Sequence, residues 1–241
     1  GIGGGAVMTP LLILFVGVRP VIAVGTDLAY GAITKAVGAL IHYRQKTVQL
    51  SIAGFLALGS VPASLLGVAL LSWMKRRGGD VQVDAFVSHA LGIVLIVVAV
   101  SLVARPHRSK KGSVEAGGLW ERHPWRRTLL TILLGAGVGF LVGLTSVGSG
   151  SLIVAGMVIL YPHLPLNRVV GTDIFHAALL VASAAMAHFR TGGVDLQLLQ
   201  WLLVGSIPGV LLGSKLSIVF PERVLRPILA VALFSVGYKL L

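Results

Sequence analysis

The sequence predicts an all-α integral membrane protein made of two homologous repeats, and three observations support this prediction. The chain has 241 residues, of which 56% are hydrophobic and only 12% are charged, and its mean hydropathy is +0.93. About a quarter of the residues of a soluble domain are charged, so half that share indicates lipid as the main solvent. Several apolar stretches reach the roughly 20 residues that a spanning helix needs. The two halves of the chain also match each other.

The composition excludes several classes of protein. The apolar content argues against a cytosolic enzyme, a nucleic-acid-binding protein and a disordered tail, even though the formal net charge is +12. The absence of cysteine excludes disulfides, thiolate metal sites and thiol nucleophiles. We therefore expect no cofactor, no metal, no catalytic residue and no nucleic-acid partner. The chain starts at Gly1 without a signal peptide, which predicts that it begins inside a longer protein.

Six regular membrane spans are predicted, together with two irregular apolar segments. The segment 1–18 is short and opens with Gly3, Gly4 and Gly5. The segment 128–161 would be about 50 Å long as one helix, against a hydrocarbon core of about 30 Å. Its middle, 143–151, is rich in Gly, Ser and Thr, which favour a half-helix, a polar loop and a second half-helix, either as a broken span or as a re-entrant hairpin. The six regular spans are 22–41, 50–73, 85–104, 168–188, 196–219 and 224–241.

A basic segment divides the chain into two halves. Residues 105–127 carry seven Arg or Lys and two Glu, and an excess of Arg and Lys is typical of cytoplasmic loops. We therefore expect a first membrane repeat over 1–104, whose N-terminal part is missing, a cytoplasmic linker over 105–127, and a second repeat over 128–241. Each repeat would hold about four helical segments, the first of them broken by glycine.

A constant offset of 146 residues relates the two halves. Val24-Gly25-Thr26-Asp27 falls on Val170-Gly171-Thr172-Asp173, and His42-Tyr43-Arg44 falls on His188-Phe189-Arg190. Duplicated membrane units with interrupted helices are the sequence signature of many secondary transporters, whose solute binds near the bilayer midplane between the copies. The repeat therefore favours transport over enzyme, scaffold or receptor, and leaves open whether the copies are parallel or inverted.

The order and duplication of these motifs resemble a known family. Gly3-Gly4-Gly5, then Val24-Gly25-Thr26-Asp27 and Lys35, then the second glycine-rich break and Val170-Gly171-Thr172-Asp173, are similar to the TauE/SafE sulfite exporters. The resemblance covers the chain except for the central linker. It implies a multi-pass protein of the bacterial or archaeal plasma membrane that exports sulfite or sulfonate-type anions. It does not specify the solute, and homo-oligomerisation stays open.

Two glycine-rich breaks are candidate anion sites. An unwound turn followed by a helix leaves backbone N–H groups and the positive end of a helix dipole for an anion. The alternative is that small residues only let helices pack closely. The residues concerned are Gly3, Gly4 and Gly5 in the first half and Gly148, Ser149, Gly150 and Ser151 in the second.

Four ionisable side chains lie inside predicted spans. Lys35 is about a dozen residues within a span, where a lysine costs about 2.5–3.5 kcal/mol on insertion scales, so we predict that it faces the solute cavity. The alternatives are that it extends to a lipid headgroup or forms a structural ion pair with an aspartate. Thr26 and Thr172 are candidate solute-binding residues, and Asp27 and Asp173 beside them are candidates for coupling an ion to transport. The alternative for both motifs, which can also hold together with the first, is a helix N-cap in which Thr or Asp accepts first-turn N–H bonds. His176 shares a helix face with Asp173 and is either a proton relay or a hydrogen-bonded structural residue.

Two alternative functions are weighed against the secondary transporter. A passive anion channel would use the same site without alternating access. An intramembrane serine protease would use Ser149 as its nucleophile and His176 or His188 as its base, but duplication of the site elements argues against it. The P-loop motif of ATP-driven pumps is absent from the sequence, so the energy would come from an ion or solute gradient.

Overall fold

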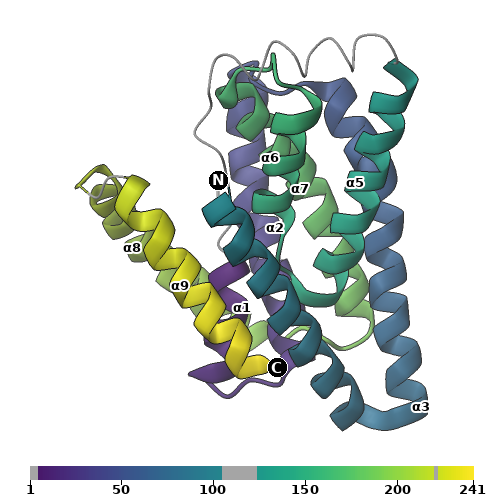
Figure 1. Cartoon of the computed structure of the whole chain (residues 1–241). Coiled ribbons are helices and arrows are strands. Elements are labelled where there is room, and N and C mark those ends of the chain that lie inside the picture. Colours follow the sequence, from purple (N-terminus) through teal and green to yellow (C-terminus); the bar gives the residue numbers. More distant parts are fainter. Residues whose placement is uncertain (1–4, 105–123, 220–221) are drawn as a thin grey trace.

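The prediction of an all-helical protein is confirmed by a computed structural model, which describes residues 5–104, 124–219 and 222–241 (Figure 1). Every regular element in these ranges is a helix. Residues 3 and 4 of the first predicted break and most of the predicted linker 105–127 lie outside the described residues. The helices are α1 Gly5–Leu14, α2 Pro20–Arg44, α3 Leu50–Ala104, α5 Pro124–Thr145, α6 Ser149–Leu160, α7 Leu166–Arg190, α8 Leu196–Val219 and α9 Glu222–Leu240.

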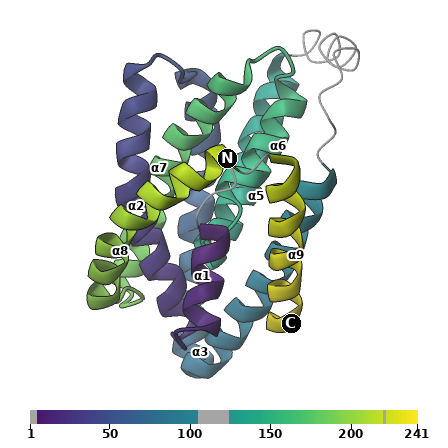
Figure 2. The ribbon, with the colours of Figure 1, turned by 90° about the vertical axis from the view of Figure 1, so that its left-hand side faces the viewer.

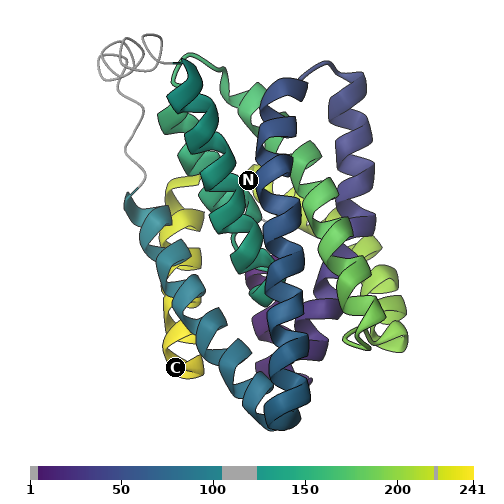
Figure 3. The same ribbon diagram turned by 90° about the vertical axis from the view of Figure 1, so that its right-hand side faces the viewer.

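By length and apolar composition, three helices in the described part of the chain can cross a membrane, namely α3, α5 and α7. The α3 helix contains a bend at Gly79, whose φ of 75° and ψ of 178° are not helical. The bend separates the two spans predicted over 50–73 and 85–104 and reverses the direction of the chain (Figure 3). Positive φ is accessible to glycine at little cost, which explains why the turn needs no longer loop.

The segment predicted over 128–161 is interrupted, but its first part is longer than the expected half-helix. Helix α5 begins at Pro124, takes up the last four residues of the predicted linker, and has 22 residues, which corresponds to about 33 Å. Helix α6 has only 12 residues, about 18 Å, and is too short to span a bilayer. The proline at the first helical position explains the early start, because its missing N–H and restricted φ suit the first turn.

Glycines allow α3 and α5 to pack with their backbones almost touching. A Cβ atom added to Gly135 would meet the backbone of Leu56, and one added to Gly139 would meet the backbone of Ser60. The register continues at Gly143, which lies against Ser64. Because the paired residues rise together along both helices, α5 and the first arm of α3 run in the same direction.

Helices α2 and α7 pack against each other in opposite directions. Gly31 lies against Val181. Gly38, about two turns further along α2, lies against Ile174, which comes earlier in α7. Buried apolar side chains of α2, α3, α6 and α7, among them Leu28, Leu56, Met157 and Leu180, form one core. A second core joins the later arm of α3 to α9, beside which α1 also lies (Figure 2).

Candidate functional site

The break between α5 and α6 consists of three residues, Ser146, Val147 and Gly148, all of them buried. Ser146 has φ of 62° and Gly148 has φ of 109°. A left-handed conformation is ordinary for glycine and uncommon for serine. The turn sends α6 back along α5, since Thr131 near the start of α5 shares a 2.8 Å hydrogen bond with the Tyr161 hydroxyl just after α6.

Lys35 reaches this break from α2. Its Nζ donates a 2.9 Å hydrogen bond to the hydroxyl of Ser149, the first residue of α6. The N-cap residue of α6 is Gly148, which offers no side-chain cap, and the first hydrogen bond of the helix runs from the Leu152 amide to the Gly148 carbonyl. The first-turn amides, those of Ser149 and Gly150 among them, therefore have no acceptor within the helix. An ammonium group and a helix N-terminus thus point to the same place.

Two buried aspartates lie within electrostatic range of Lys35. Asp27 is 3% exposed and Asp173 is 4% exposed, and they come from the antiparallel helices α2 and α7. Oδ2 of Asp27 accepts hydrogen bonds from the Thr9 hydroxyl at 2.7 Å and from the Ser146 hydroxyl at 2.8 Å. At the position 146 residues after Thr9 the sequence has Ala155, which carries no hydroxyl.

Both buried histidines of α7 are engaged away from Ser149. His176 Nε2 shares a 2.7 Å hydrogen bond with the Ser60 hydroxyl of α3. His188 Nε2 donates a 2.9 Å hydrogen bond to the Gly143 carbonyl of α5. The serine–histidine pair that a protease would need is therefore not formed at Ser149, whose hydroxyl is bonded to Lys35.

The threonines predicted beside the aspartates hold the start of another helix. Thr26 accepts a 3.0 Å hydrogen bond from the Asp195 amide, just before α8, and Thr172 accepts a 2.9 Å bond from the Gln49 amide, just before α3. The N-cap alternative for these motifs is wrong, because α2 begins at Pro20 and α7 at Leu166. The predicted spans 22–41 and 168–188 start two residues after the observed helices. Thr26 and Thr172 were therefore expected nearer to the helix starts than they are.

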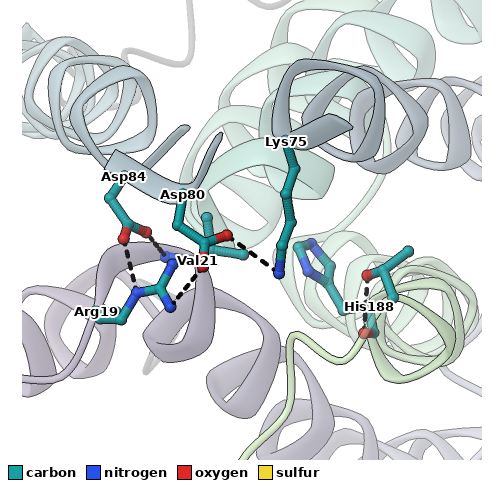
Figure 4. Close-up of polar contacts among 7 residues, drawn as sticks. Arg19, Val21, Lys75, Asp80, Asp84 and His188 are labelled. Carbon is teal, nitrogen blue, oxygen red and sulfur yellow. Dashed lines mark hydrogen bonds and ion pairs between the residues drawn. The ribbon is translucent and has the colours of Figure 1, made fainter. Parts of the chain in front are cut away.

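A charged cluster outside the buried region joins the start of α2 to the bend of α3 (Figure 4). Arg19 Nη1 lies 3.0 Å from Asp80, Arg19 Nε donates to Asp84 at 2.8 Å, and Lys75 lies 3.2 Å from Asp80. The hydrogen bonds to Asp80 and then Asp84 raise the pKa of the Arg19 guanidinium, which keeps it charged. Asp84 also accepts a hydrogen bond from the Val21 amide at 3.2 Å, and thereby caps α2 in place of a local side chain.

The structure thus brings together several predicted site residues, namely Asp27, Lys35, Gly148, Ser149, Gly150, Ser151, Asp173 and His176. Thr26 and Thr172 are buried nearby in the role described above. Gly5 begins α1, whereas Gly3 and Gly4 lie outside the described residues. The sequence reasoning missed three hydroxyl partners, Thr9, Ser60 and Ser146. Only Ser146 stood in a segment already marked as unusual.

Comparisons with known proteins agree with this membrane-embedded architecture. The profile of the family described as "Sulfite exporter TauE/SafE" matches residues 1–240. The chain is 43% identical over 242 residues to the probable membrane transporter protein YjnA of Bacillus subtilis (strain 168), covering all of this chain and 92% of that protein. The probable membrane transporter protein YunE of the same organism is 27% identical over 261 residues, covering all of this chain and 90% of YunE. No solved structure matches the chain.

Family, relatives and apolar helices define the class of the protein as a membrane transporter rather than an enzyme. The chain belongs to the sulfite exporter TauE/SafE family.

Proposed function

We propose that the protein is a secondary transporter that moves small sulfur-containing or organic anions, of the sulfite or sulfonate type, out of the cell across the plasma membrane. The observation that carries this proposal is the hydrogen bond between Lys35 Nζ and the Ser149 hydroxyl at the uncapped N-terminus of α6. The family name and the names of the relatives support the solute class and the transport role respectively.

The chemistry of this place suits an anion with several oxygen atoms. Backbone amides and the dipole at a helix N-terminus favour negative charge, and a lysine ammonium adds a point charge with three donors. The hydroxyls of Ser149 and Ser151 add further donors in the first turn of α6. A sulfite or sulfonate oxygen would take the position beside Lys35 that the Ser149 hydroxyl now occupies.

The carboxylates suggest how binding could be coupled to an ion. Lys35 lies within electrostatic range of two buried aspartates, so an arriving anion would compete with them for it. Protonation of Asp173 would weaken this competition, and a proton could reach it through His176, three residues further along α7 and within electrostatic range of Lys35. We propose that Asp173 and His176 form the coupling pair.

The arrangement of α2 and α7 supports an inverted repeat with alternating access. Both helices have 25 residues, and their starts and ends differ by the offset of 146 residues found in the sequence. They pack in opposite directions, as an inverted pair would. We propose that the two copies rock about the region between Lys35 and Asp173, with the linker 105–127 on the cytoplasmic side.

Flux into proteoliposomes tests the proposal, with sulfite, thiosulfate, sulfoacetate, sulfate and small carboxylates as candidate solutes. We expect saturable countertransport of at least one sulfur-containing anion. Replacing Lys35 by Gln should lower the apparent affinity of the protein for the transported anion by about tenfold or more, because a hydrogen bond to a charged group contributes about 1.5–3 kcal/mol. The matched control is Lys46→Gln, on the exposed residue that follows α2.

Two results would contradict the proposal. Unchanged affinity and rate in Lys35→Gln would remove this lysine from the site. An ohmic anion current that does not saturate and shows no countertransport would identify a passive channel instead.

A further inference from the structure

Asp27 joins three separate segments of the buried region through one oxygen atom. Its Oδ2 accepts hydrogen bonds from Thr9 of α1 at 2.7 Å and from Ser146 of the α5–α6 break at 2.8 Å. Asp27 itself belongs to α2, and all three side chains are buried. A buried oxygen that accepts two hydroxyl hydrogen bonds is well satisfied, and its neighbours depend on it in turn, because a hydroxyl left without an acceptor in the interior is costly.

The bond to Ser146 acts on the most irregular residue of the break. Ser146 has φ of 62°, a conformation that a non-glycine residue keeps only when its surroundings hold it there. Three residues later the chain reaches Ser149, whose hydroxyl is bonded to Lys35. Helix α2 therefore contacts this region at two points. Asp27 binds Ser146 in the break, and Lys35 binds Ser149 at the start of α6.

Two of the residues involved, Thr9 and Lys35, are not repeated at the offset of 146 residues. The residue 146 positions after Thr9 is Ala155, which has no hydroxyl, and the residue 146 positions after Lys35 is Val181. The two aspartates occupy equivalent positions in the sequence, yet the position equivalent to Thr9 carries no hydroxyl in the second half of the chain. Sequence equivalence therefore does not imply equal roles.

We infer that Asp27 is a positioning residue, which holds the N-terminus of α6 in place for the anion by accepting hydrogen bonds from Thr9 and Ser146. This inference rests on the proposed transport function. It assigns the two aspartates different tasks, because an oxygen acceptor suffices at position 27, whereas the proposed coupling role of Asp173 needs a group that titrates. The other ionisable groups of this region are Lys35 on α2 and Asp173 and His176 on α7, while α1, α3, the break and α6 present the hydroxyls of Thr9, Ser60, Ser146 and Ser149.

A labelling experiment tests the positioning role without any transport measurement. Val147 lies in the break, is fully buried and can be changed to cysteine in a chain that has none. In membranes, N-ethylmaleimide should label Val147→Cys slowly when Asp27 or Asp27→Asn is present, since the amide oxygen of asparagine can accept both hydroxyl bonds. In Asp27→Ala, labelling should be faster by about tenfold or more, because the break opens more often.

Flux measurements then test whether the hydrogen bonds to Asp27 affect anion binding. Asp27→Asn should still transport, with a KM at or below that of the wild type because one charge that competes for Lys35 is gone, whereas Asp27→Ala should raise KM. If Asp27→Ala does not accumulate in the membrane, Thr9→Val and Ser146→Ala each remove one donor and should raise both labelling rate and KM, with Ser72→Ala on α3 as the control.

Equal labelling in Asp27, Asp27→Asn and Asp27→Ala would overturn the inference, and so would loss of transport in Asp27→Asn with slow labelling retained, which would assign Asp27 a charge-dependent task. If the wild type transports none of the tested anions but the labelling pattern is as expected, the proposed function is contradicted while the positioning role of Asp27 in the break stays supported.

Discussion

The amide of Asp195 donates a hydrogen bond of 3.0 Å to the hydroxyl of Thr26 across the molecule. The reciprocal bond, from the Gln49 amide to the Thr172 hydroxyl, is 2.9 Å long. Each donor and each acceptor is displaced by the same 146 residues. Packing is reciprocal in the same way, since Gly25 lies against Gly193 and Gly171 lies against Thr47, again displaced by 146 residues. This reciprocal pattern is what the two-repeat arrangement predicted from the sequence would produce, with a loop of each half lying against a helix of the other.

The relative orientation of the copies can be measured with single cysteines. Gln45 and Thr191 are the exposed residues that end α2 and α7, and they occupy equivalent positions in the two copies. Because α2 and α7 run in opposite directions, we expect Gln45→Cys and Thr191→Cys to react with an impermeant maleimide from opposite sides of the membrane. Labelling from the same side would mean that the copies are parallel.

The first turn of α6 should tolerate little bulk if an anion approaches its amides. Replacing Gly150 by Val places a branched side chain beside these groups, and we expect transport to fall by about tenfold or more while the protein still reaches the membrane. Gly54→Val is the control, because a Cβ at this exposed glycine meets no atom within 4 Å. Normal flux in Gly150→Val would leave the break with a packing role only.

Removing the carboxyl group of Asp173 should flatten the pH dependence of transport. If Asp173 couples a proton as proposed, its protonation in the wild type frees Lys35 for the anion, so the apparent affinity for a sulfonate, which stays charged throughout the range, should increase as the pH falls. In Asp173→Asn, no proton is needed and the affinity should be nearly independent of pH. The control is Asp195→Asn, since asparagine can replace the cap that Asp195 Oδ1 offers to the amides of Gln197 and Leu198. If the apparent affinity changes with pH to the same extent in the wild type and in Asp173→Asn, Asp173 does not have this coupling role.

The close contact between α3 and α5 predicts a large difference between two neighbouring glycines. In Gly139→Ala, the new methyl group would meet the backbone of Ser60, whose hydroxyl is bonded to His176. We expect a loss of about 1–3 kcal/mol in stability, which is typical of overpacking, and a lower melting temperature in detergent. Gly137→Ala, two residues away and without neighbours within 4 Å, should melt at or above the wild-type temperature because alanine favours helix. Equal melting of the two variants would show that the helices separate at little cost.

Much of the helical architecture could be predicted because it depends on local properties of the chain. The segment predicted over 196–219 matches α8, and the segment predicted over 168–188 lies within α7. Errors occurred at helix ends, where Pro20 and Pro124 begin helices earlier than the apolar patterns suggested. Such starts depend on backbone geometry, whereas hydropathy reports only the apolar middle of a helix.

The candidate site was predictable only in part, as Lys35 and Asp27 illustrate. The cost of a charged residue in a span identified both as residues in need of partners. The partners could not be found from the sequence, since Ser149 lies 114 residues from Lys35 and Ser146 lies 119 residues from Asp27. Thr9 carried no signal at all, because a single threonine in an apolar helix is unremarkable until its neighbour is known.

By itself, the sequence determined that this protein dissolves in lipid, that its helical segments alternate with short polar turns, and that one half repeats the other at a constant spacing. These properties follow from side-chain hydropathy and backbone preference, which act over a few residues at a time. Only the tertiary structure decided that α2 and α7 lie antiparallel, that Asp27 accepts hydrogen bonds from Thr9 and Ser146, and that Asp173 lies within electrostatic range of Lys35. Such choices depend on which distant surfaces can approach closely, and the packing of whole helices settles that.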